Sequence, residues 1–178
     1  MFSTDIKDLL PGTQKKILLL ESRLEQRGLY FRRTCVYRSK VAQEALYLRG
    51  RGTYDEIIEA YKEAGMTPPL DRDEPGWWKK KVTWTLDSMH IKRRAVDYCQ
   101  RGRTPYDLKI DVNRNEVPDW EEFAIIARQC GLNAGYFWPP PKRDCPHIQD
   151  DGIYGKEGIT NSLVCVNKKE EKNEKDIV

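Results

Sequence analysis

Histidine is the scarcest metal-binding residue type in this chain, and both of its histidines lie close to carboxylates. His90 is followed by Asp97, and His147 is preceded by Asp144. A hydrolytic zinc site needs about three protein ligands from His, Asp, Glu or Cys, and one open position for water. A lone histidine is more often an ordinary surface or core residue. Two histidines that both have carboxylates nearby instead favour a catalytic metal site.

Three sequence elements, in the same order, resemble a family of zinc peptidases. The family includes D-alanyl-D-alanine carboxypeptidases, D-Ala-D-Ala dipeptidases and the L-alanyl-D-glutamate endopeptidases of phage endolysins. Its patterns are Tyr-Arg-Ser-x-x-x-Gln with Leu-Tyr-x-x-Gly-Arg, then Ser-x-His-x-x-Gly-x-Ala-x-Asp, then Asp-x-x-His. The matching residues are Tyr37, Arg38, Ser39, Gln43, Leu46, Tyr47, Gly50 and Arg51, then Ser88, His90, Ala95 and Asp97, then Asp144 and His147. The resemblance covers roughly residues 10–150.

The resemblance implies a role for each matched polar residue. His90, Asp97 and His147 would bind one zinc ion, and Asp144 would act as the general base. A carboxylate beside Zn²⁺ is ionised at neutral pH and can take a proton from the attacking water. Further candidates for substrate binding are Ser88, Gln43 and Trp138.

Arg38 offers a planar guanidinium, which suits either a substrate carboxylate or the oxyanion that develops on the attacked carbonyl. The competing interpretation is a solvated arginine among the basic residues Arg32, Arg33 and Lys40. The match to the family favours the catalytic role.

Two departures from the family pattern concern the shape of the site. The usual glycine between the histidine and the aspartate is Arg93 here, and an arginine at positive φ costs about 1 kcal/mol or more. The glycine-rich, tryptophan-containing segment before the last element is matched only loosely, by Gly135 to Trp138 and three prolines. Both departures affect the substrate pocket more than the metal ligands.

The cysteines give a rival set of metal ligands. Five cysteines, an odd number, do not suggest a disulfide framework, and we expect reduced thiols. Cys99 and Cys145 lie two residues from Asp97 and His147, a spacing that places side chains on the same face of a strand. Thiolates bind zinc well, but small buried packing residues are the commoner role for such cysteines.

A second ion is suggested by oxygen donors at the spacing of a calcium loop. Their positions in the loop are 1, 3, 5, 9 and 12, and the residues are Asp111, Asn113, Asn115, Asp119 and Glu122. Loop position 6, where calcium loops have glycine, is Glu116. Asp119 could equally be the N-cap of the following helix, which would make the segment a capped polar turn.

Size and composition predict a single domain. The chain has 178 residues, of which 33% are charged and 39% hydrophobic, and its net charge of +3 is too small to indicate a nucleic-acid partner. No apolar stretch is long enough for a membrane span. The N-terminal residues lack the pattern of a signal peptide, so we expect synthesis in the cytoplasm and action on the bacterial cell wall after phage-type release.

The pattern of apolar residues predicts an α+β fold, in which a small antiparallel sheet carries the zinc site and is flanked by helices. Helices are expected at 12–28, 39–48, 55–64 and 120–130. Strands are expected at 29–37, 82–87, 95–99 and 134–138, with a last core strand ending near Ile148.

Two segments fall outside this core. Residues 50–81 are predicted to form an inserted flap, whose Trp77, Trp78 and Lys79 to Lys81 would either contact glycan or surface anions or pack as an ordinary loop. We assign residues 1–150 to the peptidase domain and 151–178 to an extension that is disordered from about residue 167.

These features together predict a monomeric zinc peptidase that acts on peptidoglycan stem peptides. An L-alanyl-D-glutamate endopeptidase is favoured by the Leu46 to Arg51 element and by the lack of a signal peptide. The alternatives are a D-alanyl-D-alanine carboxypeptidase or dipeptidase, and a catalytically silent wall-binding module that keeps zinc for folding alone.

Overall fold

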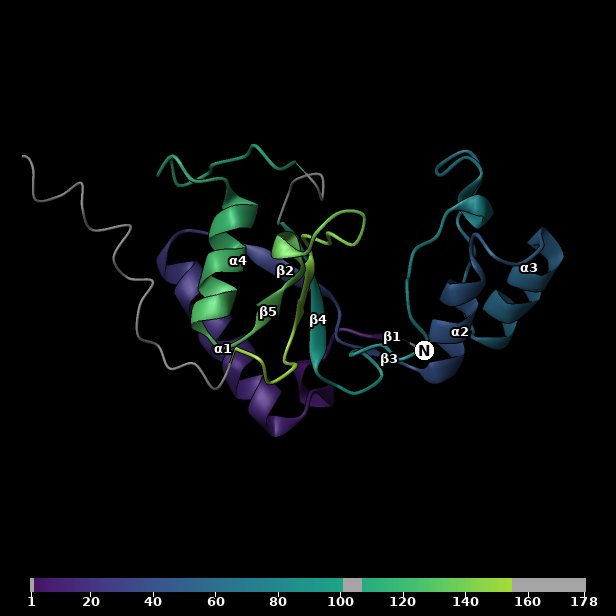
Figure 1. Cartoon of the computed structure of the whole chain (residues 1–178), viewed down its shortest axis with the longest axis horizontal. Coiled ribbons are helices and arrows are strands. Elements are labelled where there is room, and N and C mark those ends of the chain that lie inside the picture. The colour runs from purple at the N-terminus through teal and green to yellow at the C-terminus, as the bar shows by residue number, and fades with distance from the viewer. Residues whose placement is uncertain (1, 101–106, 155–178) are drawn as a thin grey trace, which may run out of the picture.

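A four-stranded antiparallel sheet lies at the centre of the protein (Figure 1). The computed structural model describes residues 2–100 and 107–154. The strands follow the order β2 (Phe31–Cys35), β4 (Ala95–Gln100), β6 (His147–Gln149) and β5 (Asn133–Ala134). A separate two-stranded ribbon pairs β1 (Phe2–Ser3) with β3 (Tyr37–Arg38).

Two helices cover one face of the sheet, α1 (Pro11–Gln26) and α4 (Asp119–Gln129) (Figure 1). In α1 the buried residues Ile17, Leu20 and Leu24 recur every three or four positions, which gives the helix one apolar side. They join apolar residues of α4 and of the strands in one core cluster. Two short 3-10 turns, η1 (Ile6–Asp8) and η3 (Gly135–Phe137), complete this part of the chain.

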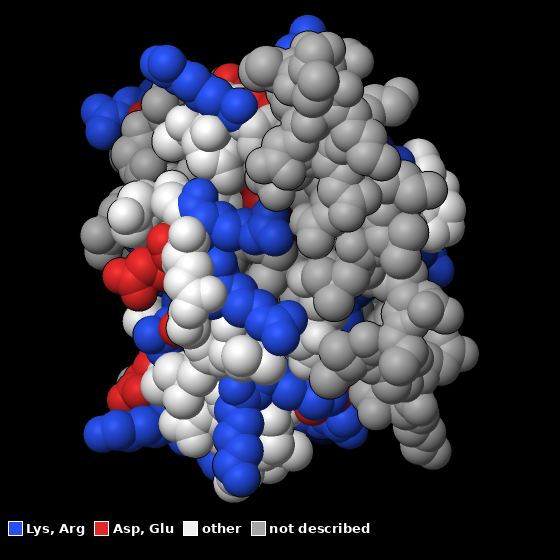
Figure 2. All heavy atoms as spheres, turned by 90° about the vertical axis from the view of Figure 1, so that its left-hand side faces the viewer, with Lys and Arg blue, Asp and Glu red and all other residues white. Residues whose placement is uncertain are grey.

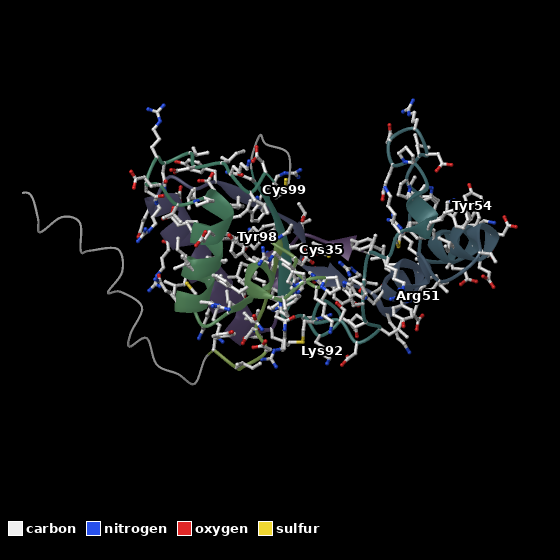
Figure 3. All side chains as sticks on the ribbon, turned by 45° about the horizontal axis from the view of Figure 1, so that its top comes forward. Cys35, Arg51, Tyr54, Lys92, Tyr98 and Cys99 are labelled. Carbon is white, nitrogen blue, oxygen red and sulfur yellow. The ribbon has the colours of Figure 1, made fainter. Side chains whose placement is uncertain are left out.

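The predicted flap (residues 50–81) packs with the preceding helix, and together they form a helical layer with a hydrophobic cluster of its own. It consists of α2 (Lys40–Leu48), α3 (Tyr54–Glu63) and η2 (Trp77–Lys79), seen on the right of Figure 1. The buried members of the cluster are Ala42, Ala45, Ile57, Tyr61, Ala64 and Trp77. Figure 3 shows Arg51 and Tyr54 in this layer, apart from Tyr98 and Cys99 of the central sheet.

Local hydrogen bonds explain where these helices begin. The Ser39 hydroxyl accepts a hydrogen bond from Ala42 N and caps the start of α2. Thr53 and Glu56 form a capping box at the start of α3. Trp77 is 2% exposed, so it is a packing residue and not a surface contact for glycan.

The predicted α+β class and its four helices are confirmed, but two predicted strands are wrong. Residues 82–87 have no strand partner among the described residues; instead the Thr85 carbonyl accepts from Gln43 Nε2, and Asp87 N donates to the Thr85 hydroxyl. The strand predicted at 134–138 ends at Ala134, where η3 begins. Nearly all of the predicted C-terminal extension lies outside the described residues, and the proposed domain limits stay a prediction.

The described surface adds two observations. None of the described helices is long and apolar enough to cross a membrane. The face on the side of α1 and α4 shows more basic than acidic side chains among its described residues (Figure 2), in keeping with the small positive net charge.

Candidate metal centre

Strand register brings three polar residues into one row across the sheet. Asp97 on β4 is paired with Cys35 on β2 and with His147 on β6. Directly paired residues of antiparallel strands have their side chains on the same face. The neighbours of Asp97 along β4, Val96 and Tyr98, belong to the core under α1 and α4, so this row lies on the opposite face of the sheet.

A tight turn between residues 88 and 94 brings His90 to this row. The Ser88 hydroxyl accepts from His90 N, and the His90 carbonyl accepts from Arg93 N. Arg93 has a φ of 59°, so it adopts the left-handed conformation that the family's glycine would favour, at a cost of about 1 kcal/mol. Ser88 therefore shapes the turn, and the predicted substrate contact of its side chain stays a prediction.

The three predicted zinc ligands lie together. His90 Nε2 is 3.1 Å from Asp97 Oδ2, and His147 Nδ1 is 2.8 Å from Asp97 Oδ1. The two imidazole rings lie 5.1 Å apart, centroid to centroid. Both histidines are buried, whereas the Asp97 side chain is 22% exposed. The two histidine rings are therefore buried, and the Asp97 side chain between them is only partly accessible to solvent.

The hydrogen bonding of His90 provides a test of whether a cation fits here. Its Nδ1 lies 3.2 Å from the Val36 carbonyl oxygen, which can only accept a hydrogen bond. In the neutral ring the lone pair is then on Nε2, which is buried and has no hydrogen-bond partner among the described residues. That lone pair faces a carboxylate oxygen, and two acceptors this close require a proton or a cation between them. Two nitrogens and one carboxylate are a ligand set that zinc accepts.

The charges of the site reinforce this arrangement. Burial alone would raise the pKa of Asp97, but His90 and His147 outweigh it and hold the pKa far below its usual value. Burial alone would lower the pKa of His147, but its hydrogen bond to Asp97 outweighs burial and raises that pKa above its usual value. Asp97 is therefore a carboxylate at neutral pH, as a metal ligand must be.

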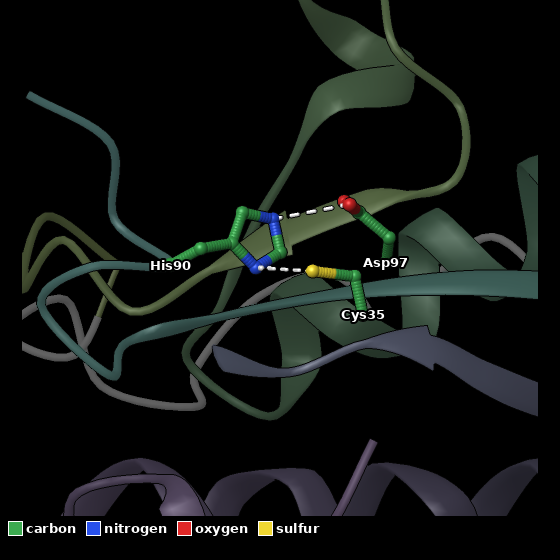
Figure 4. Close-up of side chains that lie close together, drawn as sticks. All are labelled: Cys35, His90 and Asp97. Atoms are coloured by element: carbon green, nitrogen blue, oxygen red, sulfur yellow. Dashed lines mark hydrogen bonds and ion pairs between the residues drawn. The ribbon is translucent and has the colours of Figure 1, made fainter. Parts of the chain in front are cut away.

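Cys35 is a rival ligand that the sequence analysis missed. Donor atoms of Cys35, His90 and Asp97 all lie within 4.8 Å of one another, so by distance these three residues could hold a metal ion. However, Cys35 Sγ lies 3.6 Å from His90 Nδ1, on the opposite edge of the ring from Asp97 (Figure 4). One metal ion cannot use both ring nitrogens. Burial also raises the pKa of Cys35 to about 11, so the thiol is protonated at neutral pH as long as no metal binds to it.

Arg38 contacts the site through Asp97. Its Nη2 lies 3.4 Å from Asp97 Oδ2 and 3.7 Å from Cys35 Sγ, and its Nη1 donates to Gln43 Oε1 at 2.7 Å. The amide nitrogen of Gln43 donates to Thr83 and Thr85, so this buried amide is fully used within the protein. The guanidinium thus contacts the Asp97 carboxylate, and its predicted contact with substrate stays a prediction.

Asp144 lies on the loop that enters β6. Burial raises the pKa of its carboxyl, while His147 acts to lower it and Asp97 acts to raise it. The pKa of the Asp144 carboxyl is thus influenced by the charges of His147 and Asp97, and no hydrogen bond joins this carboxyl to another described residue. A base near the ligands is chemically reasonable, because a raised pKa brings a carboxylate closer to the operating pH.

Gly135 sets the path of this loop. Its carbonyl accepts from Asp144 N, and His147 N donates to the Asp144 carbonyl. A Cβ added at Gly135 would lie inside van der Waals contact with the Asp144 carbonyl oxygen, and it would lie 3.2 Å from the His147 carbonyl oxygen. The backbone therefore passes so closely that only glycine fits, and this approach places both Asp144 and His147.

Cys99 and Cys145, the rival ligands suggested by the sequence, do not join the three predicted zinc ligands. Cys145 belongs to the hydrophobic core, and Cys99 Sγ donates to the Gln100 carbonyl. Figure 3 labels Cys99 and Cys35 at separate places on the sheet. Among the described residues, neither Cys99 nor Cys145 joins a group that could hold a metal. Trp138 packs against the site, with its ring centroid 5.2 Å from that of His147.

The predicted calcium loop is held together by its own polar groups. The amides of Asn113 and Asn115 donate to Glu122, and the Asp111 carboxylate accepts from Asn115 N and Glu116 N. Glu116, at the position where calcium loops have glycine, has a φ of 67°, which is the conformation that glycine would supply. The loop thus has the sharp turn even though its sequence has no glycine at this position.

The predicted N-cap at Asp119 is wrong. Helix α4 begins at Asp119 and is preceded by Pro118 at the cap position. The Asp119 carboxylate accepts from Val112 N and from the Gln100 side chain, so it closes the loop and does not cap the helix. Burial raises the pKa of Asp119, with Asp111 and Glu122 among the groups that add to the rise.

Comparisons with known proteins give little beyond this geometry. No protein-family model matches the chain, and no curated protein matches it. A crystal structure of Serratia marcescens L-Ala D-Glu endopeptidase ChiX is similar at 18% sequence identity, with a TM-score of 0.47, over 81% of this chain and 81% of that chain. A likeness this low carries no argument about function, which we therefore argue from the site.

The close approach at Gly135 leads to the first testable prediction. We expect Gly135→Ala to lower stability by about 3 kcal/mol through overpacking and to reduce zinc binding, because the 144–147 loop must move away. Thermal unfolding of the metal-free protein and zinc content after loading measure the two effects. Gly12→Ala is the matched control, since nothing lies within 4 Å of its added Cβ. Normal zinc binding by Gly135→Ala would refute the positional role.

The loop from Asp111 to Glu122 gives the second prediction. If calcium binds there, an excess of about 100 times the dissociation constant stabilises the protein by about 2.7 kcal/mol. We expect calcium to raise the melting temperature of chelator-treated protein, and Glu122→Gln to abolish that rise. An unchanged melting temperature in excess calcium would leave the loop as a polar turn without an ion.

Proposed function

We propose that this protein is a zinc-dependent peptidase that hydrolyses peptidoglycan stem peptides, with the bond between L-alanine and D-glutamate as its target. The observation that carries the proposal is the pair of ring nitrogens, His90 Nε2 and His147 Nδ1, on the two oxygens of Asp97. The partial exposure of Asp97 and the nearby carboxyl of Asp144 support a catalytic site over a purely structural one. The substrate class rests on the resemblance of the sequence elements.

Each residue has a distinct task in this proposal. His90, Asp97 and His147 would hold the zinc ion, which when bound supplies a Lewis acid for the attacked carbonyl. Asp144 takes a proton from the attacking water and delivers it to the leaving amine, so that the peptide bond is replaced by a carboxyl and an amino group. Arg38 keeps the Asp97 carboxylate oriented through the contact at 3.4 Å.

The proposal is tested with Asp144→Asn. We expect zinc content and melting temperature to stay unchanged while hydrolysis of purified cell wall falls by at least about 100-fold, because the variant lacks the base. Asp73→Asn, at an exposed carboxylate between α3 and η2, is the matched control and should retain full activity. Full activity of Asp144→Asn would contradict the proposed mechanism.

The same digest identifies the bond that is cut. Mass spectrometry of the products should find a new N-terminal D-glutamate if the protein is an L-alanyl-D-glutamate endopeptidase. Released D-alanine would instead indicate the carboxypeptidase or dipeptidase alternative. A wild-type protein that binds zinc and releases neither product would favour the wall-binding module that uses zinc only for folding.

A further inference from the structure

A chain of hydrogen bonds leads away from His147 on the side opposite Asp97. His147 Nε2 lies 3.2 Å from Gln149 Oε1, and Gln149 Nε2 donates to Asp151 Oδ2 at 3.1 Å. His147 and Gln149 are two residues apart on β6, so both side chains emerge on the same face of the sheet. The sequence analysis assigned no role to Gln149 or Asp151.

The orientation of each amide in this chain follows from its neighbours. Trp138 Nε1 can only donate, and it donates to Asn133 Oδ1 at 3.1 Å. Asn133 therefore turns its Nδ2 to Asp151 Oδ2, at 2.6 Å. Asp151, when ionised, can only accept, so Gln149 also turns its nitrogen to Asp151 and its oxygen to His147.

The ionised state of Asp151 is supported by its surroundings. Burial alone would raise its pKa, but hydrogen bonds from Asn133, Ile153 and Gln149 hold the pKa below its ordinary value. Asp151 thus remains an acceptor at neutral pH.

We propose that Gln149, fixed in orientation by Asp151, selects the His147 tautomer that binds the metal through Nδ1. An oxygen beside Nε2 requires a hydrogen on that nitrogen, and the neutral ring then has its lone pair on Nδ1, which points to Asp97. His90 is fixed in the opposite sense, because the Val36 carbonyl faces its Nδ1 and leaves the lone pair on Nε2. Gln149 and Asp151 are positioning residues in this proposal, which rests on the proposed zinc site.

The matched experiment compares Gln149→Leu with Gln129→Leu, the same substitution at a half-buried position of α4. Zinc affinity is measured by competition with a chromogenic chelator. Partners of metal-bound histidines typically contribute a factor of about 10–100 to affinity. We expect Gln149→Leu to weaken zinc binding by that factor, with no change in the melting temperature of the metal-free protein, and Gln129→Leu to leave the affinity unchanged.

A second readout follows the tautomer itself. Because the chain contains only two histidines, ¹⁵N-histidine labelling gives just four ring-nitrogen signals. In the zinc-loaded protein we expect the hydrogen of His147 on Nε2 in the wild type, and a mixture of rings bound through Nδ1 and through Nε2 in Gln149→Leu. The His90 signals should not change. A substitution that affected only folding would not change which ring nitrogen of His147 carries the hydrogen.

A double variant tests whether Asp151 acts through Gln149. If it does, Asp151→Asn as a single substitution weakens zinc binding, but the double variant binds zinc no more weakly than Gln149→Leu. Unchanged zinc affinity in Gln149→Leu, or a loss explained by a lower metal-free melting temperature, would overturn the proposal. A wild-type protein that binds zinc without cleaving peptidoglycan would refute the proposed function and leave this inference standing, whereas a wild type that binds no zinc would refute both.

Discussion

The Asp97 carboxylate, with a ring nitrogen on each of its oxygens, is the interaction on which the site depends. It exists because β4 pairs with β6 in a register that sets Asp97 opposite His147. A shift of one residue would turn Asp97 to the face covered by α1 and α4, where a carboxylate without partners is costly. Burial of the apolar face therefore determines which side chains lie on the polar face, because the residues beside Asp97 along β4 must face the core.

The surrounding elements hold the two histidines against this carboxylate. The turn before β4 presents His90 with its Nδ1 on a backbone carbonyl, and the close approach at Gly135 guides the chain into β6. The helical layer also contributes, because Gln43 on α2 orients Arg38, which reaches Asp97. Residues of other elements thus help to set the geometry around Asp97, as the hydrogen-bond partners of ligands do in known metal sites.

Much of this arrangement could be predicted from the sequence, and the exceptions have physical reasons. Apolar periodicity gave the helices, and the scarcity of histidine pointed to His90 and His147. The 82–87 strand was mispredicted because alternating apolar residues cannot show whether a neighbouring strand exists. Cys35 was missed because it lies opposite Asp97 only through strand pairing. Gln149 could have been suspected from its spacing of two residues after His147, since such residues share a face.

The most direct test of the account is X-ray absorption at the zinc edge of the zinc-loaded protein. A site formed by His90, Asp97 and His147 has only nitrogen and oxygen ligands, at about 2.0–2.2 Å. We expect that shell and no sulfur, and the same spectrum from Cys35→Ala. A sulfur ligand at about 2.3 Å, lost in Cys35→Ala, would contradict the account and assign the metal to Cys35.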